Sequence, residues 1–195
     1  MSGVMRVLIG GVGYRWMGDS SFGVVASDVL ARQQWPAGVE VADLGYGALY
    51  AALDLVDARP RYDRLILLAA ACRNRLPGRL YSYRWAPSPS DDADLQERIR
   101  EAGAGVIGID HLLQIARHFA ALPDDVLCIE LEPHVTSDVS RTSLEPGAVS
   151  GLSRISYPTG DTLTASAAAC LHDALRLVRT EVLIPAVAHH EGRTC

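Results

Sequence analysis

An uninterrupted apolar run, Leu65 to Ala71, constrains the fold of this chain more than any other feature. A strand that is apolar on both faces is typical of the middle of a parallel sheet whose two faces are covered by helices. The run is far shorter than the roughly 20 residues that span a bilayer, so it does not indicate a membrane segment. A chain of 195 residues is long enough to bury such a sheet within one domain.

Strand and helix patterns alternate on both sides of this run. We expect further strands at 6–12, 39–43, 79–85 and 126–131, and helices at 22–33, 48–56, 94–102, 106–122 and from a cap at Asp161 or Thr162 through Val178. Because 79–85 alternates aromatic and polar residues, it predicts an antiparallel edge strand. The order predicts a three-layer α/β/α doubly wound domain at 5–184 with a mixed sheet of about five strands. The segment 132–157 is predicted to be mostly loop, and 185–195 a flexible C-terminal tail.

The composition excludes several classes of chemistry. All 18 basic residues are arginine, and the absence of lysine excludes a Schiff base, a phosphate-binding-loop lysine and a serine–lysine pair. The net charge of -5 and the 6% aromatic content give no basis for binding nucleic acid or an anionic membrane. The cysteines match neither a disulfide framework nor a zinc site, and the N-terminus lacks the pattern of a secretory signal. We therefore expect a cytoplasmic protein.

The loop after the first strand, residues 10–23, is rich in glycine. A dinucleotide-binding fingerprint needs GxGxxG at the helix start, whereas Gly11 and Gly13 are followed by Arg-Trp-Met with no third glycine in register. The sequence therefore disfavours nucleotide binding. The loop is expected to cross the carboxyl edge of the sheet, where ligands of such folds bind. Asp19 stands at the start of the next helix, and capping that helix is its simplest role.

Several motifs follow one another in a recognisable order, namely MRVLIGGVG at 5–13, Gly18-Asp19 with Gly23, RLILLAAA at 64–71 before LPG, and VLCIELEP at 126–133. Over about 130 residues this order resembles the endopeptidases that mature nickel–iron hydrogenases. The resemblance implies a three-layer α/β fold. It also implies removal of a C-terminal extension from the hydrogenase large subunit once nickel is in place. Nickel recognition in that family uses an acidic residue, an aspartate and a histidine at the carboxyl edge of the sheet.

The resemblance assigns the two carboxylate positions to residues that are not acidic. The acidic residue after Gly-Asp falls on Ser20, and the aspartate that ends the central strand falls on Ala69. A divalent ion needs several anionic or imidazole donors, which serine and alanine do not supply. We therefore assign no metal ligand and no cofactor. Nickel would be held only if Asp19 and a histidine restored the site.

The histidine position has two alignments. Ungapped counting from the strand at 126–131 places Gly108 or Gly105 there, whereas a slip of about three residues brings His111 into the position. Both interpretations of His111, as a retained ligand and as a histidine on the helix surface, remain open.

Two further residues complete the candidate cleft. Asp43 and Gly45 follow the second strand, and a loop cap is the simpler role for Asp43 than a catalytic base. Cys72 follows the central strand beside Arg73 and Arg75, whose charges are expected to lower the pKa of a reactive thiol. The simpler interpretation of Cys72 is a small, partly buried side chain.

Arginines and aromatic residues alternate between Arg73 and Trp85. Five acidic residues between Asp91 and Glu101 are expected to balance this charge, so a protein-binding edge or a solvated surface is favoured over a nucleic-acid stripe.

Three hypotheses of function follow. The first is a hydrogenase maturation protease-like protein with an altered nickel-sensing site that binds a partner protein or peptide at the carboxyl edge and is inactive as a protease. The second is an active endopeptidase that trims a hydrogenase large subunit, using Asp19, Asp43 and His111. The third is a small-molecule hydrolase or transferase in which Cys72 or Ser20 reacts. The expected partner is a protein, a hydrogenase large subunit or its homologue, with no nucleic acid and no membrane.

Overall fold

The structure of the chain is a computed structural model that describes residues 4–87, 92–134 and 162–185. Its strands are β1 (Val7–Val12), β2 (Val39–Asp43), β3 (Arg64–Ala70), β4 (Arg79–Arg84) and β5 (Asp125–Glu132). Its α-helices are α1 (Phe22–Ala31), α2 (Ala48–Asp57), α3 (Asp92–Gly103), α4 (Ile109–His118) and α5 (Ala165–Leu183), and a short 3-10 helix, η1 (Gly18–Ser21), precedes α1.

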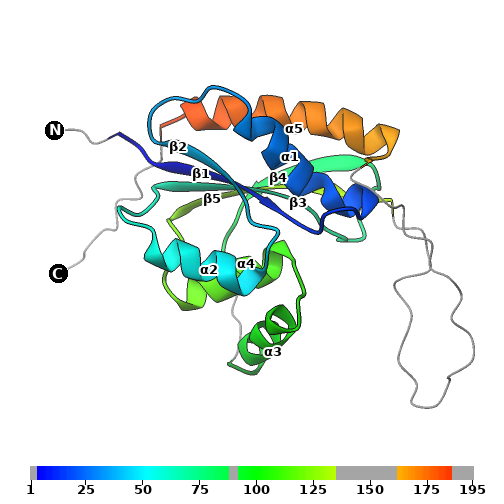
Figure 1. Cartoon of the computed structure of the whole chain (residues 1–195). Helices are drawn as coiled ribbons and strands as arrows, with labels where there is room; N and C mark the ends of the chain where they lie inside the picture. The colour runs from blue at the N-terminus through cyan, green and yellow to red at the C-terminus, as the bar shows by residue number, and fades with distance from the viewer. Residues whose placement is uncertain (1–3, 88–91, 135–161, 186–195) are drawn as a thin grey trace, which may run out of the picture.

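The strands form one mixed sheet in the order β2-β1-β3-β5-β4. The first four are parallel, and β4 pairs antiparallel with β5 at the edge. Helices α1 and α5 cover one face of the sheet, and α2 and α4 cover the other, with α3 packed outside α4 (Figure 1). The three-layer α/β/α fold and its antiparallel edge strand are therefore confirmed.

The apolar run that begins at Leu65 forms the centre of the sheet. Strand β3 lies between β1 and β5, and Leu65 to Leu68 are fully buried because helices cover both faces. Leu65 and Leu67 belong to the core under α2 and α4, and Ile66 and Leu68 to the core under α1 and α5. Alternation along one strand thus fills both cores.

Two glycines allow α1 to lie directly against the sheet. A Cβ on Gly11 would lie 2.2 Å from the carbonyl oxygen of Gly23, and a Cβ on Gly23 would lie 2.3 Å from the carbonyl oxygens of Leu68 and Val12. Only glycine permits such a close approach of backbone to backbone. The glycine-rich loop therefore fixes where η1 and α1 begin relative to the carboxyl ends of β1 and β3.

Two sequence predictions about helix ends were wrong. The helix predicted at 106–122 is shorter, because Gly108 is its extended N-cap and the chain leaves helical geometry at Ala120, where φ is 50°. The last helix is capped by Thr164, whose side chain accepts from the amide of Ala167, rather than by Asp161 or Thr162. The loop predicted at 132–157 begins one residue too early, because Glu132 belongs to β5, and its residues 135–157 lie outside the described residues, as does the predicted tail from residue 186 on. Within the described part of the chain, no helix has the length and apolar character needed to cross a membrane.

Candidate functional site

The carboxyl edge of the sheet gathers the loops that follow β1, β2, β3 and β5. All the site residues predicted from the sequence lie on these loops, on the ends of these strands, or at the start of α4. They divide into two groups, one on the face covered by α1 and α5 and one on the face covered by α2 and α4.

Asp19 lies in η1, and its side chain belongs to the face covered by α5. It is only 8% exposed, and its carboxylate accepts from both the amide and the hydroxyl of Thr164, at 2.9 and 3.0 Å. Thr164 is the N-cap of α5, so Asp19 contacts the start of α5 and not the start of the helix that follows it in sequence. The expectation that Asp19 caps the following helix was therefore wrong: the N-cap of α1 is Ser21, without a side-chain cap bond, and Asp19 holds the start of α5.

Ser20 and Ala69 stand at the two positions where the resemblance implies carboxylates. Ser20 is a half-buried residue of η1, and its amide donates to the carbonyl of Met17. Ala69 is 1% exposed on β3 and lies in register between Val12 of β1 and Glu130 of β5. A carboxylate is thus present at the level of Ala69, but on the neighbouring strand.

Asp43, at the end of β2, closes its own loop. Its Oδ1 accepts from the amide of Gly45 at 2.7 Å, and its Oδ2 accepts from Nη2 of Arg15 at 2.6 Å. Arg15 also makes a two-bond contact with Asp28 on α1, at 2.8 and 2.9 Å. A Cβ on Gly45 would lie 2.5 Å from the carbonyl oxygen of Gly13, so glycine lets the loops after β1 and β2 touch.

Arginines from the loop after β3 surround two buried glutamates of β5. Glu130 is completely buried and accepts from Arg73 and Arg75, each at 2.7 Å, and from the hydroxyl of Tyr83 at 2.8 Å. Glu132 accepts from the backbone amide of Arg73 and from Nε of Arg75. We call this group, completed by Asp110 of α4, the Arg73 network: Arg73, Arg75, Tyr83, Asp110, Glu130 and Glu132.

Asp110 and Tyr81 hold the arginines of the network in place. The guanidinium of Arg73 donates to both oxygens of Asp110 at 2.7 and 2.8 Å. The guanidinium of Arg75 lies 4.1 Å from the centre of the Tyr81 ring, which is a cation–π contact. The arginines at 73 and 75 are therefore neutralised by β5 and α4. The expectation that acids between Asp91 and Glu101 balance them was wrong.

The network determines the ionisation of Glu130. Burial raises its pKa, but hydrogen bonds from Arg73 and Tyr83 and the charge of Arg73 lower it, and the net pKa lies below its ordinary value of 4.5. Its charge is therefore stable at neutral pH. A carboxylate whose lone pairs are taken by two guanidiniums and a phenol has little capacity left for a further ligand.

His111 lies in the first turn of α4, on the face opposite Asp19. It is 8% exposed, and its Nε2 lies 2.8 Å from Oε2 of Glu101 on α3. The hydrogen bond to His111 lowers the pKa of Glu101. Asp19 binds the start of α5 and His111 binds α3, so the structure does not bring these two residues together.

Cys72 follows β3 and is exposed. The prediction that neighbouring arginines lower its pKa was wrong: partial burial and the charge of Glu132 raise it, and Arg73 opposes them only in part. The physical reason is that the guanidinium of Arg73 is already paired with Asp110 and Glu130. Cys128 and Cys170 are buried, as expected of core residues.

The described side chains at the carboxyl edge provide no set of free donors that fits a nickel ion. Within residues 4–87, 92–134 and 162–185, no three His, Cys, Asp or Glu side chains form a group that could hold a metal. The carboxylates of the edge are occupied by arginine, threonine or backbone donors. The alternative histidine positions, Gly105 and Gly108, carry no ligating side chain.

Sequence reasoning missed the glutamates of the network. The signal was present: Glu130 and Glu132 alternate with apolar residues in an otherwise buried strand, which requires partners for both charges. Their partners follow β3, and only the adjacency of β3 and β5 brings them together.

No protein-family model and no curated protein matches the chain. Among solved structures, it is similar to the hydrogenase 2 maturation peptidase from Thaumarchaeota archaeon SCGC_AB-539-E09, with 26% identity and a TM-score of 0.56 over 92% of this chain and 99% of the other. It is also similar to the hydrogenase maturating endopeptidase HybD from E. coli, with 20% identity and a TM-score of 0.59 over 91% and 92% of the two chains. The nickel–iron hydrogenase maturation protease HybD from Thermococcus kodakarensis aligns at 17% identity and a TM-score of 0.55, over 91% and 99%.

Proposed function

We propose, from the premise that this chain belongs to the nickel–iron hydrogenase maturation protease family, that it binds a segment of a partner protein at the carboxyl edge of its sheet without sensing nickel. The partner is a hydrogenase large subunit or a homologue, and the chain does not cleave it. We place this activity in the cytoplasm.

The use of the edge carboxylates is the observation that carries this proposal. Asp19 is committed to the start of α5, Asp43 to Gly45 and Arg15, and Glu130 to two arginines and a tyrosine. Freeing any one of them for a metal would leave its present donors unpaired, which costs about 1–3 kcal/mol per buried group. Ser20 and Ala69 add no anionic donor.

Exposed aromatic side chains at the same edge support a protein partner. Trp16 is 68% exposed in the loop after β1, and Tyr46 and Tyr50 are 50% and 64% exposed between β2 and the first turns of α2. Trp16 has a φ of 61°, a conformation that non-glycine residues adopt rarely. Tryptophan and tyrosine dominate the binding energy of protein interfaces. We infer that these side chains contact the partner.

A nickel titration tests whether the protein binds this metal. The purified protein is titrated with NiCl2 in a calorimeter, and no stoichiometric binding of micromolar or better affinity is expected, because the edge lacks free anionic donors. Stoichiometric nickel binding in that range would overturn this part of the proposal.

A binding assay tests the partner. A nickel–iron hydrogenase large-subunit precursor from the same organism is offered in nickel-free and nickel-loaded forms, and the chain is expected to bind both equally and to leave both at full length. The variant Trp16→Ala is expected to bind at least about tenfold more weakly, a loss of about 1.4 kcal/mol. The matched control is Trp85→Ala, whose side chain packs against the α2 and α4 core away from this edge. A trimmed product would show the active endopeptidase instead.

A further inference from the structure

The open side of β4 is a second surface of the molecule. Among the described residues, β4 is the last strand of the sheet and pairs with β5 alone. The amide of Trp85 donates to the carbonyl of Val126 at 2.8 Å, so Trp85 and every second residue before it in β4 form hydrogen bonds to β5. The residues between them, Leu80, Ser82 and Arg84, direct their backbone N–H and C=O groups away from β5. An exposed edge of this kind is a template for another strand.

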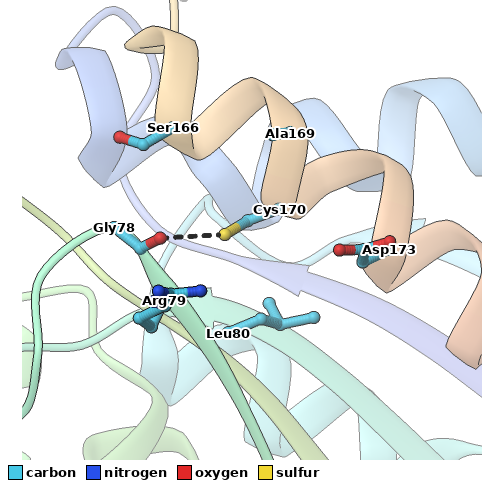
Figure 2. Close-up of a pocket in the computed structure, with 7 residues that line it drawn as sticks. All are labelled: Gly78, Arg79, Leu80, Ser166, Ala169, Cys170 and Asp173. Atoms are coloured by element: carbon cyan, nitrogen blue, oxygen red, sulfur yellow. Dashed lines mark hydrogen bonds between the residues drawn. The ribbon is translucent and has the colours of Figure 1, made fainter.

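A groove runs between the start of β4 and helix α5. It has a volume of about 530 Å³ and is lined by Gly78, Arg79, Leu80, Ser166, Ala169, Cys170 and Asp173. Figure 2 shows that the helix contributes small side chains and that the thiol of Cys170 points at the carbonyl of Gly78, to which it donates at 3.3 Å. A strand added to β4 would therefore have room for its side chains below α5.

The charge of the groove and edge strand favours an acidic ligand. β4 has an arginine at each end and no carboxylate. Arg84 is paired with Asp125 and Glu181, and Asp173 of the groove is paired with Arg176. No ion pair joins Arg79 to any carboxylate within the described part of the chain, so its charge is available to a ligand.

We propose that β4 binds an acidic peptide segment of a partner protein as an added strand, with its backbone paired to Leu80, Ser82 and Arg84 and a carboxylate beside Arg79. The backbone bonds provide the affinity, and Arg79 and the small side chains of α5 select the sequence. This inference does not rest on the proposed function, because it concerns the lateral edge of the sheet and requires nothing of the loops that replace the nickel site.

A second copy of this chain fits the edge poorly. Antiparallel pairing of two β4 strands would bring no carboxylate beside Arg79, because β4 itself carries none. An acidic peptide instead neutralises Arg79.

Fluorescence anisotropy tests the proposal with a fluorescein-labelled peptide that alternates valine and glutamate. It is expected to bind at least about tenfold more tightly than a peptide that alternates valine and arginine. Methylation of its alternate backbone nitrogens, which blocks strand pairing, is expected to weaken binding by a similar factor. Equal binding of the two peptides, or no effect of the methyl groups, would overturn the proposal.

Variants of β4 locate the binding. Ser82→Pro removes one outward amide and leaves the bonds to β5 intact, so it should abolish binding of the acidic peptide, while Ser82→Ala should not. Arg79→Glu should reverse the preference between the two peptides. If Ser82→Pro fails to fold, the methylated peptide and Arg79→Glu decide the question. A concentration-dependent dimer in light scattering that Ser82→Pro dissolves would show a second copy on the edge and overturn the proposal.

Discussion

The two faces of the sheet neutralise the carboxylates of the carboxyl edge by different means. On the face covered by α2 and α4, Glu130 is bound by full positive charges from Arg73 and Arg75. On the face covered by α5, Asp19 is bound by a neutral amide and a hydroxyl of Thr164. The first arrangement pairs a buried carboxylate with two half-buried guanidiniums, and the second is a single carboxylate that orders the start of a helix.

This difference has an energetic consequence. A buried ion pair gains little net stability from its formation, but removal of one partner leaves an uncompensated charge and is costly. A carboxylate that accepts from neutral donors is worth about as much as an ordinary cap. The Arg73 network should therefore be sensitive to the loss of a single member, and the Asp19 contact much less so.

Arg73→Met should have the largest effect. It removes one of the two guanidiniums that pair with completely buried Glu130, and we expect the free energy of unfolding to fall by about 1.5–3 kcal/mol. Urea unfolding followed by circular dichroism measures the change. The additional substitution Glu130→Gln should restore part of the loss, because a neutral side chain at 130 no longer needs the missing guanidinium and Arg75 keeps Glu132 as a partner.

Arg100→Met is the matched control for this variant. Arg100 pairs with Glu97 on the exposed surface of α3, and such pairs contribute at most about 1 kcal/mol. If Arg73→Met and Arg100→Met lowered the free energy of unfolding equally, the network would not isolate Glu130 from water.

Acid should weaken the network selectively. The folded pKa of Glu130 lies below the ordinary value of 4.5, so its ionisation stabilises the fold above that pH, and the contribution is lost as the pH falls through the folded pKa. In Arg73→Met, burial is no longer opposed by Arg73, so the pKa of Glu130 should rise. The stability difference between wild type and variant should therefore be largest near neutral pH and shrink in acid. A difference that is constant with pH would contradict the assignment.

Asp19→Ala should have a smaller effect. It removes both bonds to Thr164, and we expect a loss of about 1–2 kcal/mol, with faster amide hydrogen exchange in the first turn of α5. Asp173→Ala on the same helix is the control, because Asp173 is exposed and pairs with Arg176 within the helix. If Asp19→Ala costs no more than this control, Asp19 does not order the start of α5.

The contrast between the faces also separates what sequence could predict from what it could not. Strand β3 and the Asp43 to Gly45 turn follow from local signals, an apolar run and an Asp-x-Gly spacing, and both are present. The partner of Asp19 lies 145 residues away, and the partners of Glu130 depend on the order of the strands. A local sequence pattern contains neither the contact between residues so far apart nor the order of the strands. The partners of these carboxylates therefore could not be assigned from the sequence.

Cys72 provides the smallest and last test. It is exposed, yet its pKa is raised by partial burial and by Glu132, because the nearest guanidinium is committed to the network. Its reaction with iodoacetamide near neutral pH should therefore be slower than that of free cysteine, since only the thiolate reacts. Peptide mapping by mass spectrometry measures the rate.

Cys128, completely buried with its pKa raised to about 12, should stay unmodified in the folded protein. Cys72→Ala should change stability by less than about 0.5 kcal/mol. Alkylation faster than that of free cysteine would instead favour a reactive thiol, and with it a hydrolase or transferase on this edge of the sheet.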